Sequence, residues 1–213
     1  MDWIPFAETM QSRFEEVHGE LDERALVRKG NTAYAAALGL LMAGDPTASE
    51  WFRLAAASWR ESFDAGDDST AWGRPIGVIK ATLLAGDGEA AAEHAGWTLE
   101  LGAATAESPI GRYAATLALL VLGRWAEARH LAESLRARGD FPPDVADALA
   151  FIAAHDVIGY CESVESVVDS FESRKEFLAE APVADTPLVL AILARRREIE
   201  EPLPASPLLP APP

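Results

Sequence analysis

Two Glu-x-x-His pairs are the residues best spaced to bind a metal ion. Glu15 with His18, and Glu127 with His130, each lie three positions apart, so both members of a pair would project from one face of a helix. Carboxylate-bridged di-iron proteins use two such pairs and a Glu from each of two further helices. The apolar segments 75–85 and 113–122 contain no acidic residue, so these further ligands are missing. We therefore expect no metal site and no cofactor.

The single cysteine, Cys161, is the one candidate for a reactive thiol. A nucleophilic cysteine needs a base beside it, but His155 lies six positions away, off the same helical face. Cys161 instead shares its face with Ile158 and Val164, which favours a small buried apolar role. No glycine-rich phosphate loop follows a strand, because no convincing strand is present. We expect no catalytic residues and do not expect an enzyme; a helical-bundle metal enzyme is the least favoured alternative.

A third group of residues points to binding instead of catalysis. Arg74 and Arg112 each lie in the first turn of a predicted helix, where positive charge opposes the helix dipole. Together with Trp72, Tyr34 and Tyr113 they would form a basic, aromatic strip that suits an acidic peptide or a C-terminal carboxylate. These five residues are our predicted partner-binding site. In the alternative interpretation the arginines pair with neighbouring acids and the rings belong to the core, which is the commoner role for any single residue.

Prolines mark the helices that would position this strip. Pro75, Pro109 and Pro143 recur every 34 residues, each at the start of a segment rich in Ala and Leu. Proline suits the first turn of a helix because its missing N–H would have no partner there. A short break follows each segment, and a second apolar-periodic run begins after it. The breaks are Gly86-Asp87, Gly123-Arg124 and His155-Asp156. The pattern predicts helix, tight turn, helix, repeated.

The N-terminal part follows the same logic less clearly. Apolar residues at helical spacing predict one helix over 5–18, a second from after Gly19-Glu20 through Arg28, and a third that contains Tyr34 and stops at Gly44. The last predicted helix opens at Thr186-Pro187. Residues 202–213 hold six prolines and predict an extended tail.

Composition limits the partners. The chain has 213 residues, 49% of them hydrophobic, with 34 acidic and 18 basic side chains and a net charge of −16. Such a charge repels nucleic acid and anionic lipid, and no apolar run approaches the ~18 residues of a membrane span. One cysteine and no basic leader favour the cytoplasm. Only three basic residues are lysine, a composition similar to that of halophilic archaeal proteins; an ordinary acidic protein from a GC-rich genome is the alternative.

The turn that follows the segment opened by Pro109 resembles the turn of a tetratricopeptide repeat. Gly123-Arg124-Trp125-Ala126-Glu127-Ala128 has the glycine, the aromatic residue and the acidic-Ala pair of that turn, and Gly86-Asp87-Gly88-Glu89-Ala90-Ala91 is a looser version. The resemblance covers residues 30–173. It implies helix pairs whose first members line a concave groove for peptides or partner proteins. The C-terminal end, from Asp185-Thr186-Pro187 to Pro210, resembles the immunity protein 49 family, whose members are predicted helical proteins that neutralise a toxin.

These observations predict an all-α fold: about ten helices in antiparallel pairs, stacked as a short right-handed array similar to tetratricopeptide repeats. Residues 1–201 would form one helical-repeat domain and residues 202–213 the extended tail. We expect a non-enzymatic module that binds a protein or peptide, including an acidic one, as a scaffold, regulator or immunity-type inhibitor. The leading alternative is a structural homo-oligomer, for example a homodimer, with no separate ligand.

Overall fold

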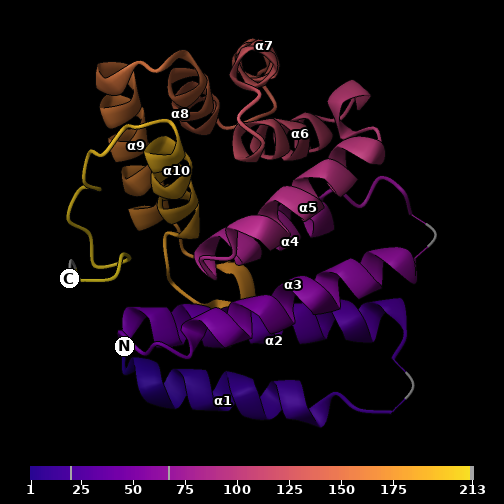
Figure 1. Ribbon diagram of the computed structural model, residues 1–213. Helices are drawn as coiled ribbons and strands as arrows, with labels where there is room; N and C mark the ends of the chain where they lie inside the picture. The colour runs from indigo at the N-terminus through magenta and orange to yellow at the C-terminus, as the bar shows by residue number, and fades with distance from the viewer. Residues whose placement is uncertain (20, 67, 212–213) are drawn as a thin grey trace.

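The computed structural model describes residues 1–19, 21–66 and 68–211 (Figure 1). Over these residues the chain is all-α, as predicted, with ten α-helices, two short 3₁₀ helices and no strand. The helices are α1 (Trp3–Glu16), α2 (Glu23–Met42), α3 (Ala48–Asp64), α4 (Gly73–Leu84), α5 (Gly88–Glu100), η1 (Ala103–Thr105), α6 (Pro109–Val121), α7 (Trp125–Arg136), α8 (Pro143–Ala154), α9 (Val157–Glu172), η2 (Leu178–Glu180) and α10 (Asp185–Arg196). No helix in the described ranges combines the length and the apolarity needed to cross a bilayer.

The recurring prolines lie in the first turns of α4, α6 and α8. Pro109 and Pro143 are the first residues of α6 and α8. A backbone N–H at that position has no acceptor within the helix, so proline loses no hydrogen bond there. Pro75 is the third residue of α4, because that helix begins at Gly73. Proline thus marks the first residue of α6 and α8 and lies within the first turn of α4.

The predicted breaks are tight turns, and two of the three are followed by a side-chain cap. Gly86 and Gly123 have φ of +72° and +69°, a left-handed conformation in which glycine carries no steric penalty. His155 takes the same role with φ of +56°. Asp87 and Asp156 then accept hydrogen bonds from the backbone N–H groups at the start of α5 and α9. Helix, turn, helix is therefore the local rule over residues 73–172.

Our boundary near Arg28 is wrong, because α2 runs unbroken for 20 residues from Glu23 to Met42. We predicted that this helix starts after Gly19-Glu20, and Glu20 lies outside the described residues. Asp22 caps α2, because its side chain accepts a hydrogen bond of 2.7 Å from the Ala25 N–H. Gly30 does not end the helix. A Cβ built there would lie 2.5 Å from Cδ1 of Trp59, so this glycine makes room for a ring from α3.

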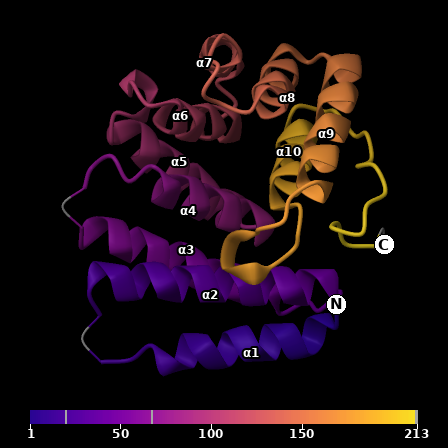
Figure 2. The same cartoon turned by 180° about the vertical axis from the view of Figure 1, so that it is seen from behind.

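The helices follow the chain in space, each packed on the next from α1 to α9 (Figure 1). Seen from both sides, they trace a curve with α10 on its inner side (Figures 1 and 2). Helix α10 contacts α4, α6, α8 and α9, and η2 contacts α2. We call the surface that α2, α4, α6 and α8 turn toward η2 and α10 the inner face. It is formed by the first helix of each pair.

The segment after α9 returns across the inner face. In α10, Val189, Leu190 and Leu193 are completely buried, and Arg196 at its end donates to the Val121 carbonyl of α6 at 2.7 Å. The proline-rich residues 202–205 lie outside regular structure. The Leu208 carbonyl of this tail accepts a hydrogen bond of 2.8 Å from Ala184. We call residues 178–211 the C-terminal segment.

Glycines on α2 and α4 let the ring of Trp59 pass between those helices. A Cβ at Gly30 or Gly77 would lie 2.5 or 2.7 Å from atoms of the ring, a distance that real side chains do not reach. The indole N–H donates to Oδ1 of Asn31 at 3.1 Å. The two glycines thus let the ring lie closely against α2 and α4, where Trp59 is only 5% exposed.

We predict that Gly77→Ala lowers the free energy of unfolding by about 1–3 kcal/mol, because the added methyl group overpacks the site against Trp59. The matched control is Gly96→Ala on α5, where a Cβ meets no atom within 4 Å. The control should gain about 0.5–1 kcal/mol from the lower backbone entropy of alanine. Urea unfolding followed by circular dichroism measures both. A Gly77→Ala protein as stable as the control would contradict the packing described.

Candidate functional site

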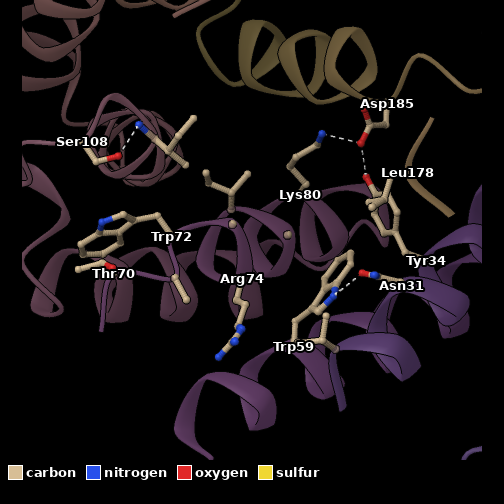
Figure 3. A pocket seen from close by; sticks show the side chains of 16 residues that line it. Asn31, Tyr34, Trp59, Thr70, Trp72, Arg74, Lys80, Ser108, Leu178 and Asp185 are labelled. Atoms are coloured by element: carbon tan, nitrogen blue, oxygen red, sulfur yellow. Dashed lines mark hydrogen bonds and ion pairs between the residues drawn. The ribbon is translucent and has the colours of Figure 1, made fainter. Parts of the chain in front are cut away.

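A pocket of about 560 Å³ remains open on the inner face, beyond the N-terminal end of α10 (Figure 3). It lies between α2 and α4, with Trp59 of α3 reaching in between them. The start of α6 and two residues of the C-terminal segment, Leu178 and Asp185, complete it. The C-terminal segment therefore fills one part of the inner face and forms one wall of the part that it leaves open.

Apolar and aromatic side chains form most of the pocket wall. Trp59 of α3 and Trp72, the residue before α4, lie well apart in the close view (Figure 3). Ile76 and Val27 extend the wall along α4 and α2. Pockets that bind ligands commonly combine such a wall with a few placed polar groups.

The main polar group is a buried cluster on Asp185. The Lys80 ammonium lies 2.5 Å from the Asp185 carboxylate, and the side chains of both residues are less than 15% exposed. The Tyr34 hydroxyl donates to the same carboxylate at 2.8 Å. Lys80 also contacts the Thr186 hydroxyl at 3.2 Å. The cluster joins α2 and α4 to the first turn of α10.

Charge pairing controls the ionisation of this cluster. Burial by itself raises the pKa of Asp185, but the Lys80 charge and the hydrogen bonds from Lys80, Tyr34 and Thr186 outweigh it and lower the pKa below its ordinary value. Burial, followed by the Asp185 charge, raises the pKa of Tyr34 well above its ordinary value. Asp185 is therefore an anion and Tyr34 a neutral donor at neutral pH.

Three of the five residues predicted for the partner site line this pocket: Tyr34, Trp72 and Arg74. The Arg74 side chain points away from Lys80 and Asp185 (Figure 3). Its guanidinium forms an ion pair with Glu23 and donates to the Ser62 carbonyl at 2.9 Å. Arg74 therefore pairs with an acidic side chain, as in the alternative interpretation. The acid is Glu23 and not one of those close to Arg74 in the sequence.

The other two predicted residues, Arg112 and Tyr113, do not line the pocket. Arg112 donates to the Ala106 carbonyl at 3.0 Å and to the Ser134 hydroxyl at 3.3 Å. Tyr113 is buried and packs against Phe141 with ring centroids 5.4 Å apart. The structure thus does not bring the two arginines into one strip.

The residues considered for chemistry stay apart. Helix α1 ends at Glu16, so His18 lies beyond the helix that carries Glu15. Glu127 and His130 are both exposed on α7. In the described part of the chain, no three side chains of His, Cys, Asp or Glu come together as a metal site.

Sequence reasoning missed Lys80, Asp185 and Trp59. Lys80 gave a usable signal, because it is the only charged residue between Ile76 and Leu84 in an apolar helix of a lysine-poor chain. A charge in such a helix needs a partner, and an acidic residue at the start of another helix was the natural candidate. The identity of that helix was not visible, because 105 positions separate Lys80 from Asp185.

Comparisons of the chain with protein-family models, with curated proteins and with solved structures gave no match.

We predict that Lys80→Met lowers the free energy of unfolding by about 3–5 kcal/mol, because it leaves the Asp185 carboxylate buried without its counter-charge. Asp185→Leu should have a similar effect through Lys80. The double variant should lose much less than the sum of the two, because neither charge is then left alone. Arg129→Met, which breaks an exposed ion pair on α7, serves as the control and should change stability little. Additive losses at Lys80 and Asp185 would contradict their coupling.

The pH dependence of stability follows from the lowered pKa of Asp185. Its contribution is complete above the pKa of an unfolded aspartate, about 3.9, and is lost as the pH falls through the lower folded value. We predict that the free energy of unfolding of the wild type, relative to that of the Lys80→Met/Asp185→Leu variant, is constant from pH 7 to 5 and falls below pH 4. Urea titrations of both proteins at each pH measure this difference. A difference that stays constant down to pH 2.5 would contradict the assignment.

Proposed function

We propose that the protein is a non-enzymatic module that binds a segment of a protein or peptide in the pocket on its inner face. The observation that carries the proposal is the way in which the inner face already binds a segment of this chain. It takes up an apolar helix, α10, and holds the carboxylate at the start of that helix through Lys80 and Tyr34. The adjoining pocket also has a mainly apolar wall, and no described residue fills it.

The arrangement of the helices supports a resemblance to tetratricopeptide repeats in this proposal. The first helix of each pair, α2, α4, α6 and α8, contacts either η2 or α10. Those are the helices that line the groove in that family. The proposal differs in extent: α10 covers parts of α4, α6 and α8, so an external segment would bind in the pocket between α2 and α4.

Two further interpretations stay open. The residues that resemble the immunity protein 49 family form α10 and the tail, which pack against the core, so an immunity-type inhibitor would use the pocket and not these residues to meet a toxin. A structural homo-oligomer is the other alternative. Single exposed apolar side chains, such as Ile158 at 74% and Leu178 at 54% exposure, do not by themselves mark an interface. We propose neither nucleic acid nor a membrane as partner, in view of the net charge of −16.

Filling the pocket tests the proposal. Gly73 lines the pocket, and a Cβ there meets no atom within 4 Å, so Gly73→Trp should fold normally and occupy the space. Peptides selected by the wild-type protein from a displayed random library should bind Gly73→Trp at least about tenfold more weakly, a loss of about 1.4 kcal/mol. Gly96→Trp on α5, a glycine with equally open surroundings, is the control and should bind like the wild type. Isothermal titration measures all three.

Two outcomes would contradict the proposal. Selected peptides that bind Gly73→Trp as tightly as the wild type would place the binding surface elsewhere. A library that yields no binder, together with a dimeric mass in light scattering for both the wild type and Gly73→Trp, would favour the structural homo-oligomer.

A further inference from the structure

Three consecutive arginines at the end of α10 have no acidic partner among the described residues. The ion pairs of the described residues engage Lys80 and seven arginines. None of these pairs includes Arg195, Arg196 or Arg197, although the chain has 34 acidic residues and a net charge of −16. Positive charge is therefore left unbalanced at this one end of α10.

Arg196 is held beside a small hollow. Its guanidinium donates one hydrogen bond, of 2.7 Å, to the Val121 carbonyl at the end of α6. A guanidinium has five N–H groups, and this is the one hydrogen bond that it makes to the described residues. Arg196 lines a hollow of about 280 Å³ with Val121, Leu122, Gly123 and Trp125. The described lining of this hollow, which we call the Arg196 hollow, contains no acidic residue.

A second arginine lies against the aromatic wall of the Arg196 hollow. The guanidinium carbon of Arg197 lies 4.8 Å from the centre of the Trp125 ring, a distance at which the ring attracts a cation. Trp125 is therefore already in contact with one positive side chain and lines the hollow beside another. An incoming cation would meet two like charges, whereas an anion would meet two opposite ones.

Helix dipoles balance only part of this charge. Arginine in the last turn of a helix offsets the negative end of the dipole, which amounts to about half an elementary charge. The ends of α10 and α6 both lie at Arg196, so together they supply about one negative charge. Arg196 and Arg197 carry two positive charges, and α7 begins at Trp125 with the positive end of its own dipole. Local positive charge therefore remains.

The acids close to these arginines in the fold or in the sequence do not neutralise them. Glu127, in the first turn of α7, is paired with Arg124 at 2.6 Å. Glu198 and Glu200 follow the arginines in the chain, but both are exposed and neither forms an ion pair with a described residue. The carboxylate that Arg196 lacks is therefore one that another molecule can supply.

Other hollows of the protein contain arginines or a lysine that are already paired. In the pocket between α2 and α4, Lys80 is paired with Asp185 and Arg74 with Glu23. A hollow of about 460 Å³ between α3 and α5 is lined by two arginines and also by the aspartates that pair with them: Arg53, Arg60, Asp87 and Asp64. A carboxylate entering either place would have to compete with one that is present. At Arg196 it would not.

From these observations we propose that the Arg196 hollow binds a carboxylate side chain of a partner protein, with an apolar neighbour of that acid against Trp125 and Leu122. Arg196 would contact the carboxylate through paired N–H groups, and Leu122, at 36% exposure, offers apolar surface beside it. The site is separate from the proposed peptide pocket, because the two share no lining residue and lie at opposite ends of α10.

Two capped dipeptides of nearly equal shape test the inference. Acetyl-Leu-Glu-amide carries the carboxylate, and acetyl-Leu-Gln-amide replaces it by a neutral amide. Each is titrated at low ionic strength into the ¹⁵N-labelled full chain and followed at the Trp125 indole N–H signal, which is assigned with Trp125→Phe. The acidic probe should shift this signal and bind at least about fivefold more tightly than the neutral one. Salt at about 0.5 M should remove most of the difference, because it screens exposed charges.

Arg196→Gln should bring the two probes to equal affinity, because it removes the charge and keeps an N–H donor for the Val121 carbonyl. Arg195→Gln removes the same charge from a neighbouring residue that does not line the hollow, so this matched control should keep the preference. Circular dichroism verifies that both variants fold. Equal binding of the probes to the wild type would overturn the inference, as would an unchanged preference in Arg196→Gln.

Gly73→Trp separates this inference from the proposed function. It fills the pocket between α2 and α4 and should leave the binding of acetyl-Leu-Glu-amide unchanged. Loss of that binding in Gly73→Trp would place the acidic probe in the pocket and overturn the assignment to Arg196. Failure of the dipeptides to shift the Trp125 signal would do the same, and peptides that need an open pocket at Gly73 would still support the proposed function.

Discussion

A buried carboxylate, Asp185, links the first turn of α10 to α2 and α4. Asp185 is nearly closed off from water, and an isolated charge there would be strongly unfavourable. It is stable because Lys80 of α4 and Tyr34 of α2 both reach it. An ion pair of this kind adds little stability compared with a well-packed apolar pair, but it penalises any arrangement that separates its members. It therefore fixes where α10 begins, and with it the end of the pocket.

Glycine beside an aromatic ring is the second device that shapes the site. Trp59 lies between Gly30 and Gly77, and Trp72 packs so closely on Gly111 that a Cβ there would lie 2.9 Å from its nitrogen. In each case the missing side chain allows a large ring to lie against a neighbouring helix. The rings are buried enough to belong to the core, yet they also form the pocket wall. Core and site roles, which the sequence presents as alternatives, are here combined in the same side chains.

The local features of the fold could be predicted from the sequence, whereas the long-range contacts could not. Proline in a first turn, glycine in a turn and aspartate as a cap act through near neighbours, so the helices from α4 to α9 could be predicted closely. The break predicted after Arg28 is absent, and Gly30, which follows it, lies inside α2 and makes room for Trp59 of another helix. At the site, Tyr34, Trp72 and Arg74 were found by residue type, but the partner of Arg74 is Glu23, 51 positions away. In the sequence, Asp185 stood out only as the first residue of the segment that resembles the immunity protein 49 family, and the helix start was placed at Thr186-Pro187.

The crossing of α10 over α4, α6 and α8 has a consequence for how such a chain can change in length. Open helical arrays grow or shrink by duplication or loss of a hairpin, because each unit meets only its neighbours. Here one helix contacts three first helices at once, so a hairpin inserted between α4 and α8 would move α6 and α8 away from α10. The return helix therefore restricts the number of hairpins between α4 and α8.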